Sequence, residues 1–167
     1  MNHQTLIERS HKQACDKGFY ENPQPRAMRI ALIGEELYEM LGAYRKGKVN
    51  PDFNDVEAMK QSFEVEIADK VIRIYDFMGF ESIPYREMKP TLKFTMELGN
   101  DILLLNKALL KIKKSFGHIG QYQDLTVNKL LALVLAFAQL YNVDIEKYIV
   151  WKLDYNLNRE YMHGKKF

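Results

Sequence analysis

The chain has 167 residues, 47% of them hydrophobic, so it is long enough to fold as one domain with a sizeable core. Its 24 Lys and Arg residues nearly balance 22 Asp and Glu residues. The formal net charge of +2 excludes a globally basic protein that binds nucleic acid or anionic membranes through overall charge. We therefore expect a single domain over residues 1–167, with neither nucleic acid nor membrane among its partners.

Cysteine content and the chain start indicate a cytoplasmic protein. Cys15 is the only cysteine and cannot form an internal disulfide, so we expect a partly buried small residue in a reducing compartment. The first residues lack the basic-then-apolar pattern of a secretory signal. The longest apolar run, residues 130–141, contains Gln139 and is too short to span a bilayer.

Apolar residues recur with helical spacing in six stretches. In chain order, helices are expected at about 3–17, 26–46, 54–77, 92–116, 124–140 and 144–161. Residues 81–90 contain two prolines and no periodicity, which predicts a loop. No stretch alternates long enough to predict a strand. The expected fold class is all-α, a bundle of about five or six helices.

Glycines and capping residues set the expected helix ends. Gly18, Gly47 and Gly79 are expected to terminate the first three helices. Asp124 or Thr126 is expected to cap the fifth helix, since Asp and Thr accept hydrogen bonds from free N–H groups. Asp144 is expected to cap the sixth for the same reason.

Two acidic runs about thirty positions apart lie inside apolar helical patterns. Residues three apart share a helix face, so Glu36 and Glu39 form one stripe. Glu66 and Asp69 form a second stripe on the next helix. A solvated face is the plainer interpretation of one such stripe, but both stripes adjoin apolar residues. Carboxylates gathered beside a core repel and lose solvation unless a cation or raised pKa values compensate.

The types of ligand in the two acidic runs indicate which metal ion they would bind. Neither acidic run contains His or Cys, and oxygen ligands favour hard divalent ions. We therefore expect Mg²⁺, with Mn²⁺ as a possible substitute. If the two helices are antiparallel, two residues from each can meet on one ion.

The C-terminal segment carries basic groups at helical spacing. Lys152, Asn156 and Arg159 fall at i, i+4 and i+7, and His163-Gly164-Lys165-Lys166 follows. Basic groups on one stripe suit phosphate oxygens. Exposed Lys and Arg near a helix C-terminus also occur as ordinary compensation of the helix dipole.

Together these segments resemble the MazG-like, all-α nucleoside triphosphate pyrophosphohydrolases. Their mark is Glu-Glu-x-x-Glu followed on the next helix by Glu-x-x-Asp, and the C-terminal Lys-x-x-x-Asn-x-x-Arg segment also looks like theirs. The resemblance implies Mg²⁺-dependent hydrolysis of (deoxy)nucleoside triphosphates between the α and β phosphates, in nucleotide-pool house-cleaning. It also implies a homodimer or homotetramer.

Residue roles follow from the matched positions. The expected metal ligands are Glu36, Glu39, Glu66 and Asp69. The expected catalytic residues are Glu35 and Glu39, with Glu35 either orienting the water or reaching a second ion. The expected phosphate-binding residues are Lys152, Asn156, Arg159 and Lys165, which would act either within one chain or across a subunit boundary. Arg73 is expected to pair locally with the acids, and Asp76 to support the site without touching the ion.

Other interpretations stay open. The same acidic pattern occurs in relatives that act on dUTP or on a phosphoribosyl-ATP intermediate, and a nucleotide-binding bundle without turnover would retain it. Phe19 or Tyr20 either stacks on a base or simply packs. A di-iron bundle has weak support from Glu8-x-x-His11 and Glu160-x-x-His163, which lie near the chain ends.

Overall fold

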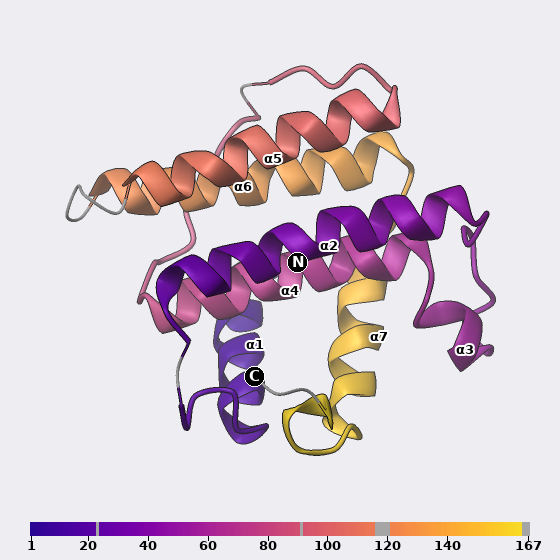
Figure 1. Cartoon of the computed structure of the whole chain (residues 1–167), viewed down its shortest axis with the longest axis horizontal. Helices are drawn as coiled ribbons and strands as arrows, with labels where there is room; N and C mark the ends of the chain where they lie inside the picture. The colour runs from indigo at the N-terminus through magenta and orange to yellow at the C-terminus, as the bar shows by residue number, and fades with distance from the viewer. Residues whose placement is uncertain (23, 91, 116–120, 165–167) are drawn as a thin grey trace.

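The computed structural model describes residues 1–22, 24–90, 92–115 and 121–164 (Figure 1). Within these ranges it has seven α-helices, a terminal 3₁₀ helix and no strand. In chain order these are α1 (His3–Asp16), α2 (Arg26–Arg45), α3 (Val56–Met59), α4 (Phe63–Phe80), α5 (Leu98–Ser115), α6 (Gln121–Leu140), α7 (Ile145–Leu157) and η1 (Tyr161–Gly164). The predicted all-α class is confirmed; six helices are long, and α3 is a single turn.

Helix α4 lies at the centre of the bundle and packs against α1, α2, α6 and α7. Figure 1 shows α2 and α4 side by side, the α5–α6 pair on one side of them, and α1 and α7 on the other. Helix α4 is buried around most of its circumference, and Ile67, Val71 and Ile74 are fully buried. A helix with apolar residues on so many sides is stable only when other helices cover them.

Helices α2 and α4 are antiparallel. At one end the Arg29 guanidinium lies over the Phe80 ring, 4.0 Å from its centroid. At the other end the Tyr44 and Phe63 rings lie 5.3 Å apart. The start of α2 therefore faces the end of α4, which places the two acidic runs opposite each other.

Helix α1 holds α7 in place. Gln13 donates from Nε2 to the Leu153 carbonyl at 2.8 Å, and Lys17 donates from Nζ to the Leu157 carbonyl at 2.8 Å. Leu157 is the last residue of α7, so its carbonyl oxygen has no partner within the helix. These bonds fix the end of α7 against α1 and α4.

Two of the three glycine terminators are confirmed. Gly18 and Gly47 follow α1 and α2 with φ of +85° and +67°, a conformation that favours glycine. Gly79 was wrongly expected to end its helix, because α4 continues to Phe80. Its role is close packing: a Cβ built there would lie 2.4 Å from His11 Cβ on α1.

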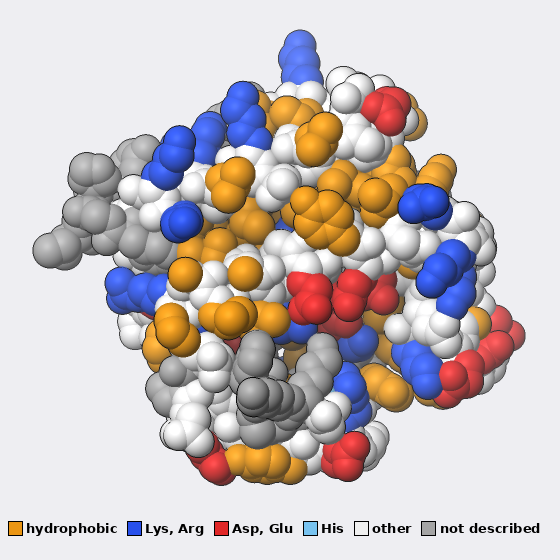
Figure 2. Space-filling model, in the orientation of Figure 1, with side chains coloured by type: hydrophobic (Ala, Val, Ile, Leu, Met, Phe, Trp, Pro, Cys, Tyr) orange, Lys and Arg blue, Asp and Glu red, His pale blue; other side chains and the backbone are white. Residues whose placement is uncertain are grey.

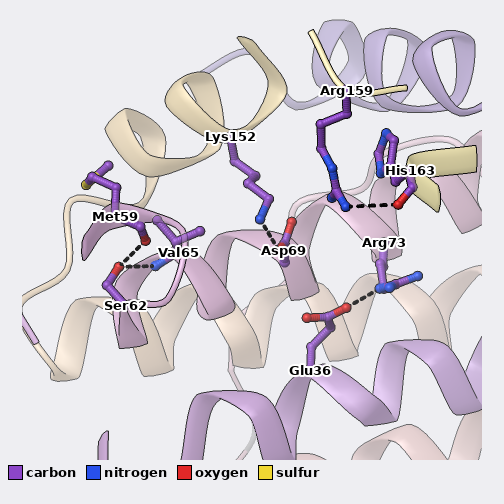
Figure 3. A network of polar contacts seen from close by, with 9 residues as sticks. All are labelled: Glu36, Met59, Ser62, Val65, Asp69, Arg73, Lys152, Arg159 and His163. Carbon is purple, nitrogen blue, oxygen red and sulfur yellow. Dashed lines mark hydrogen bonds and ion pairs between the residues drawn. The ribbon is translucent and has the colours of Figure 1, made fainter. Parts of the chain in front are cut away.

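The helix expected at 54–77 is two helices. Ser62 accepts a hydrogen bond from the Val65 N–H at 3.3 Å and donates to the Met59 carbonyl at 2.9 Å (Figure 3). Asp55 caps α3 by accepting from the Ala58 N–H at 3.0 Å. These local bonds compete with a continuous helix and separate α3 from α4.

The fourth helix begins later than expected, at Leu98 rather than about residue 92. The Asp101 carboxylate is buried and accepts from the backbone N–H groups of Thr95 and Met96, at 2.7 and 3.1 Å. Glu97 accepts from Gly99 at 3.1 Å, as an N-terminal cap would. The side chains thus fold residues before Leu98 into a turn.

The ends of the last two helices also differ. Helix α6 begins at Gln121, so Asp124 lies in its first turn and Thr126 inside the helix. Asp144 occupies the N-cap position of α7 but makes no side-chain capping bond. Helix α7 ends at Leu157, not near residue 161.

Cys15 is exposed, which contradicts the expected partial burial. The buried side of α1 carries Leu6, Ile7, Ser10 and Gln13, and Cys15 lies off that stripe.

Among the described helices, no single one is long and apolar enough to cross a membrane. Helices α6 and α7 reach the necessary length and composition only as a pair, which is bent by 110°.

We expect His3 to make stability fall with decreasing pH. Its Nδ1 lies 2.7 Å from the Tyr75 hydroxyl and its ring stacks on Tyr85, and burial lowers its pKa below the usual value. Below about pH 6.5 the unfolded chain therefore binds a proton that the folded chain does not, and stability is lost until the folded pKa is passed. Urea unfolding at pH 7.5 and 5 should show a smaller pH dependence in His3→Gln than in the wild type. Equal slopes would contradict this assignment.

Candidate active site

Three carboxylates converge between α2 and α4. One oxygen each from Glu36, Glu39 and Glu66 lies within 4.8 Å of the other two. Ligand oxygens on opposite sides of Mg²⁺ lie about 4 Å apart, since each bond is roughly 2.1 Å long. A small movement of the three side chains toward one another would bring their carboxylate oxygens to that spacing. No His or Cys of the described chain belongs to this group, so its donor set fits a hard ion.

Glu36 is the buried member of the group. Its side chain is 2% exposed, Oε1 pairs with Arg73 Nε, and Oε2 has no partner among the described residues (Figure 3). Burial raises the pKa of Glu36, and the nearby Asp69 charge raises it further. Arg73 offsets part of this cost, which confirms the predicted local ion pair. A cation at the cluster would supply the missing partner of Oε2.

Asp69 lies outside this group and faces α7. Its Oδ2 is 2.6 Å from Lys152 Nζ, and the two side chains are 20% and 7% exposed (Figure 3). The contact is within one chain. Asp69 remains a predicted metal ligand, but metal binding there has to compete with Lys152.

A second amine is buried beside the site. Lys70 is fully buried and donates from Nζ to the Ile33 carbonyl of α2 at 2.8 Å. Burial lowers its pKa to about 7, and the Glu36 carboxylate opposes that shift. The sequence analysis did not single out this residue.

A cavity of about 370 Å³ opens next to the acidic cluster. Its walls come from α1, α2, α4 and the C-terminal segment, and Glu35, Glu36, Glu39 and Asp69 line one part of it. Its volume is within the usual range for small-molecule sites, roughly 300–1,000 Å³. Figure 2 shows acidic side chains gathered over the middle of the molecule, with Lys and Arg side chains beside them.

Glu35 is exposed and lines the cavity without joining the three-carboxylate group. It occupies a different side of α2 from Glu36, because adjacent helical residues diverge by about 100°. Glu35 is therefore open to water next to the cluster.

The C-terminal segment reaches the same cavity by a turn. Asn156 and Arg159 line it together with His163, and Arg159 donates from Nη2 to the His163 carbonyl at 3.3 Å. Because α7 ends at Leu157, Arg159 does not share a helix face with Lys152, as the spacing had predicted. Lys165 lies outside the described residues.

Lys17, the residue that follows α1, holds this turn in place. Its Nζ bonds the Leu157 carbonyl and also the Arg159 carbonyl. The backbone that carries Arg159 is thus tied to α1, and Figure 3 shows the Arg159 side chain extending toward the helix that bears Asp69 and Arg73.

Several cavity residues were missed from the sequence. Ser10 and Gln13 line the cavity and lie at i+4 and i+7 from Leu6 on the buried face of α1. The sequence signal that could have identified them is the presence of polar residues at positions of an otherwise apolar helix stripe. Arg29 at the start of α2 also lines the cavity, although it resembles an ordinary helix-terminal residue in the sequence.

Phe19 and Tyr20 have different positions. Phe19 lines the cavity. The Tyr20 hydroxyl donates to Asp76 Oδ1 at 2.7 Å, and Asp76 also lies 2.9 Å from His11 Nδ1. His11 is thus paired away from the carboxylate group, and neither it nor His163 belongs to that group in the described chain.

Comparison with known proteins adds no assignment. No family model, curated protein or solved structure matches this chain. The chemistry of the arrangement itself therefore has to indicate the function.

Proposed function

We propose that the protein hydrolyses (deoxy)nucleoside triphosphates at the α–β phosphate bond in the presence of Mg²⁺. One observation supports this most: the group of Glu36, Glu39 and Glu66 adjoins a ligand-sized cavity that Arg159 also lines. Carboxylates on one side suit a cation, and a guanidinium on the other suits phosphate oxygens. The two together match an anionic substrate that binds with a divalent ion.

Glu36, Glu39 and Glu66 would hold the ion. A divalent ion so placed draws charge from the phosphates and lowers the pKa of bound water. Glu35, exposed beside the group, accepts the proton of the attacking water, and Glu39 positions that water from the same helix. One water is consumed as the anhydride breaks into monophosphate and pyrophosphate.

Arg159 and Lys152 bind the phosphates in this proposal. Arg159 donates two parallel bonds, and Lys152 acts as a point charge. Lys152 is held by Asp69 in the structure, so substrate phosphates would draw it away. Asp69 would then be released toward the ion, which couples phosphate binding to completion of the ligand set.

The experiment is a panel of ribo- and deoxynucleoside triphosphates with Mg²⁺, with products resolved by ion exchange. Monophosphate and pyrophosphate in equal amounts are expected, and Mn²⁺ is expected to replace Mg²⁺. Strong preference for dUTP would indicate the dUTPase-like alternative. Turnover of phosphoribosyl-ATP alone would indicate the relative that acts on that intermediate. Diphosphate with orthophosphate, or no turnover of any substrate, would exclude the proposed reaction.

A further inference from the structure

The cavity extends well beyond the acidic cluster. Glu36 and Arg29 both line it and are seven residues apart on α2. At 1.5 Å per residue this separation is about 10 Å along the helix axis. The cavity therefore has two ends, an acidic end at Glu36 and a second end where Arg29 lies over the Tyr20 and Phe80 rings.

Three buried polar atoms of residues that line the cavity have no partner in the described ranges of the chain. They are Ser10 Oγ, Arg29 Nη2 and Asn156 Oδ1, from residues that are 2%, 9% and 8% exposed. All three residues line the cavity. A buried polar atom without a hydrogen bond has lost its solvation without compensation, and a bound ligand that supplies the hydrogen bond accounts for it.

Arg29 is held rigidly. Its Nε donates to the Gln24 carbonyl at 3.0 Å, and its guanidinium lies over the Tyr20 and Phe80 rings, 4.3 and 4.0 Å from their centroids. These contacts fix the plane of the guanidinium. The remaining Nη2 donor is thus oriented before any ligand arrives.

Part of the cavity wall is apolar. Leu32, Ile72 and Phe77 line the cavity from α2 and α4, and Phe19 from the turn after α1. Apolar walls with a few fixed polar groups are typical of sites for planar organic ligands. An aromatic ring such as Phe19 adds a stacking surface.

Asp76 also lies at the second end, because Tyr20, over whose ring Arg29 lies, donates to its carboxylate. The negative charge of Asp76 offsets the positive charge of Arg29, so this end lacks the excess positive charge that suits a phosphate group. Asn156 Oδ1 only accepts hydrogen bonds, so it needs an N–H or O–H group on the ligand. Arg29 Nη2 needs a hydrogen-bond acceptor on the ligand, whereas the Ser10 hydroxyl can either donate or accept a hydrogen bond.

We propose that this second end is a nucleobase pocket, in which Arg29, Ser10 and Asn156 read the donor and acceptor pattern of the base edge. A heteroaromatic base offers ring or carbonyl acceptors beside N–H donors, which is the complement that these three groups require. Asn156 thereby reads the base through Oδ1 rather than holding phosphate. Because the acidic end is taken as the phosphate site, this assignment rests on the proposed function.

The test uses unphosphorylated nucleosides, so that neither metal nor turnover is needed. Ribo- and deoxynucleosides of each base are titrated against the full chain without Mg²⁺ by calorimetry, with inorganic tripolyphosphate as a separate probe. We expect base-dependent nucleoside affinities. Ser10→Ala and Asn156→Ala should each weaken the preferred nucleoside about 3- to 10-fold, as expected for one hydrogen bond, and change the order of base preference.

The matched control is Thr5→Ala, which removes an exposed hydroxyl from the same helix and should change nothing. Tripolyphosphate binding with Mg²⁺ should be the same in Ser10→Ala as in the wild type. Circular dichroism checks that each variant keeps its helices. Absence of nucleoside binding, base-independent binding, or an unchanged base order in both variants would overturn the pocket.

The two proposals fail separately. Base-selective nucleoside binding without any triphosphate hydrolysis would retain the pocket and exclude the proposed reaction. Hydrolysis of all triphosphates with the same base order in the wild type and Ser10→Ala would retain the reaction and exclude the pocket.

Discussion

Glu36→Gln is expected to lower Mg²⁺-dependent hydrolysis by roughly two to three orders of magnitude, the size of losing one preorganised electrostatic group. Glu36 supplies the buried oxygen of the three-carboxylate group, and an amide cannot replace its charge. Steady-state kinetics on the best substrate of the panel gives kcat and KM. Titration with Mg²⁺ should also require higher concentrations in the variant.

The same variant should remain folded. Gln can still accept the hydrogen bond from Arg73, and neutralising a buried carboxylate next to Asp69 removes a repulsive interaction. Circular dichroism and thermal unfolding without metal should match the wild type or exceed it. Ligand binding stabilises by about 2.7 kcal/mol at 100 times Kd, so saturating Mg²⁺ should raise Tm of the wild type more than that of the variant.

Glu57→Gln is the matched control, since Glu57 is an exposed acid of α3 whose partner is Lys60. It should retain full activity and the full Mg²⁺ response. Wild-type turnover in Glu36→Gln would mean that the ion, if one binds, lies elsewhere.

Lys152→Met is expected to destabilise the apo protein by about 2–3 kcal/mol, because it leaves the Asp69 carboxylate without its buried partner. Asp69 is 20% exposed and gains some solvation, which keeps the loss below that of a fully buried pair. Urea unfolding measures the difference. Asp69→Asn and the double variant complete a cycle, whose coupling we expect at roughly 1–3 kcal/mol.

Lys12→Met tests whether burial causes this effect. Lys12 and Asp16 form an ion pair on α1 with side chains 75% and 60% exposed, and removing it should change stability by less than about 0.5 kcal/mol. Equal small losses for Lys12→Met and Lys152→Met would show that the Lys152–Asp69 contact contributes little.

Local sequence patterns predicted much of the helical framework. Periodicity located α1, α2 and the main part of α4, because each helix has to bury an apolar stripe whatever its neighbours are. Gly18 and Gly47 could be placed since positive φ is a local property. Boundaries failed where side chains form local bonds that periodicity ignores, as at Ser62 between α3 and α4.

The acidic runs were also a local signal. Spacing alone placed Glu36 and Glu39 on one stripe, and the antiparallel packing of α2 and α4 brings Glu66 to them. The sequence by itself determined the all-α class, the helices that carry the acids and the oxygen-only character of the group, since all three follow from residue type and helical period.

Only the tertiary structure decided what surrounds that group. The Lys152–Asp69 pair, the position of Arg159 and the cavity wall of Ser10 and Arg29 all depend on how α1 and α7 dock across α4. Their partners are separated by tens of residues in the chain, and no periodicity relates them. How α1 and α7 dock depends on the packing of apolar faces and on hydrogen bonds such as the one from Gln13 to the Leu153 carbonyl. These contacts exist only once the helices are assembled.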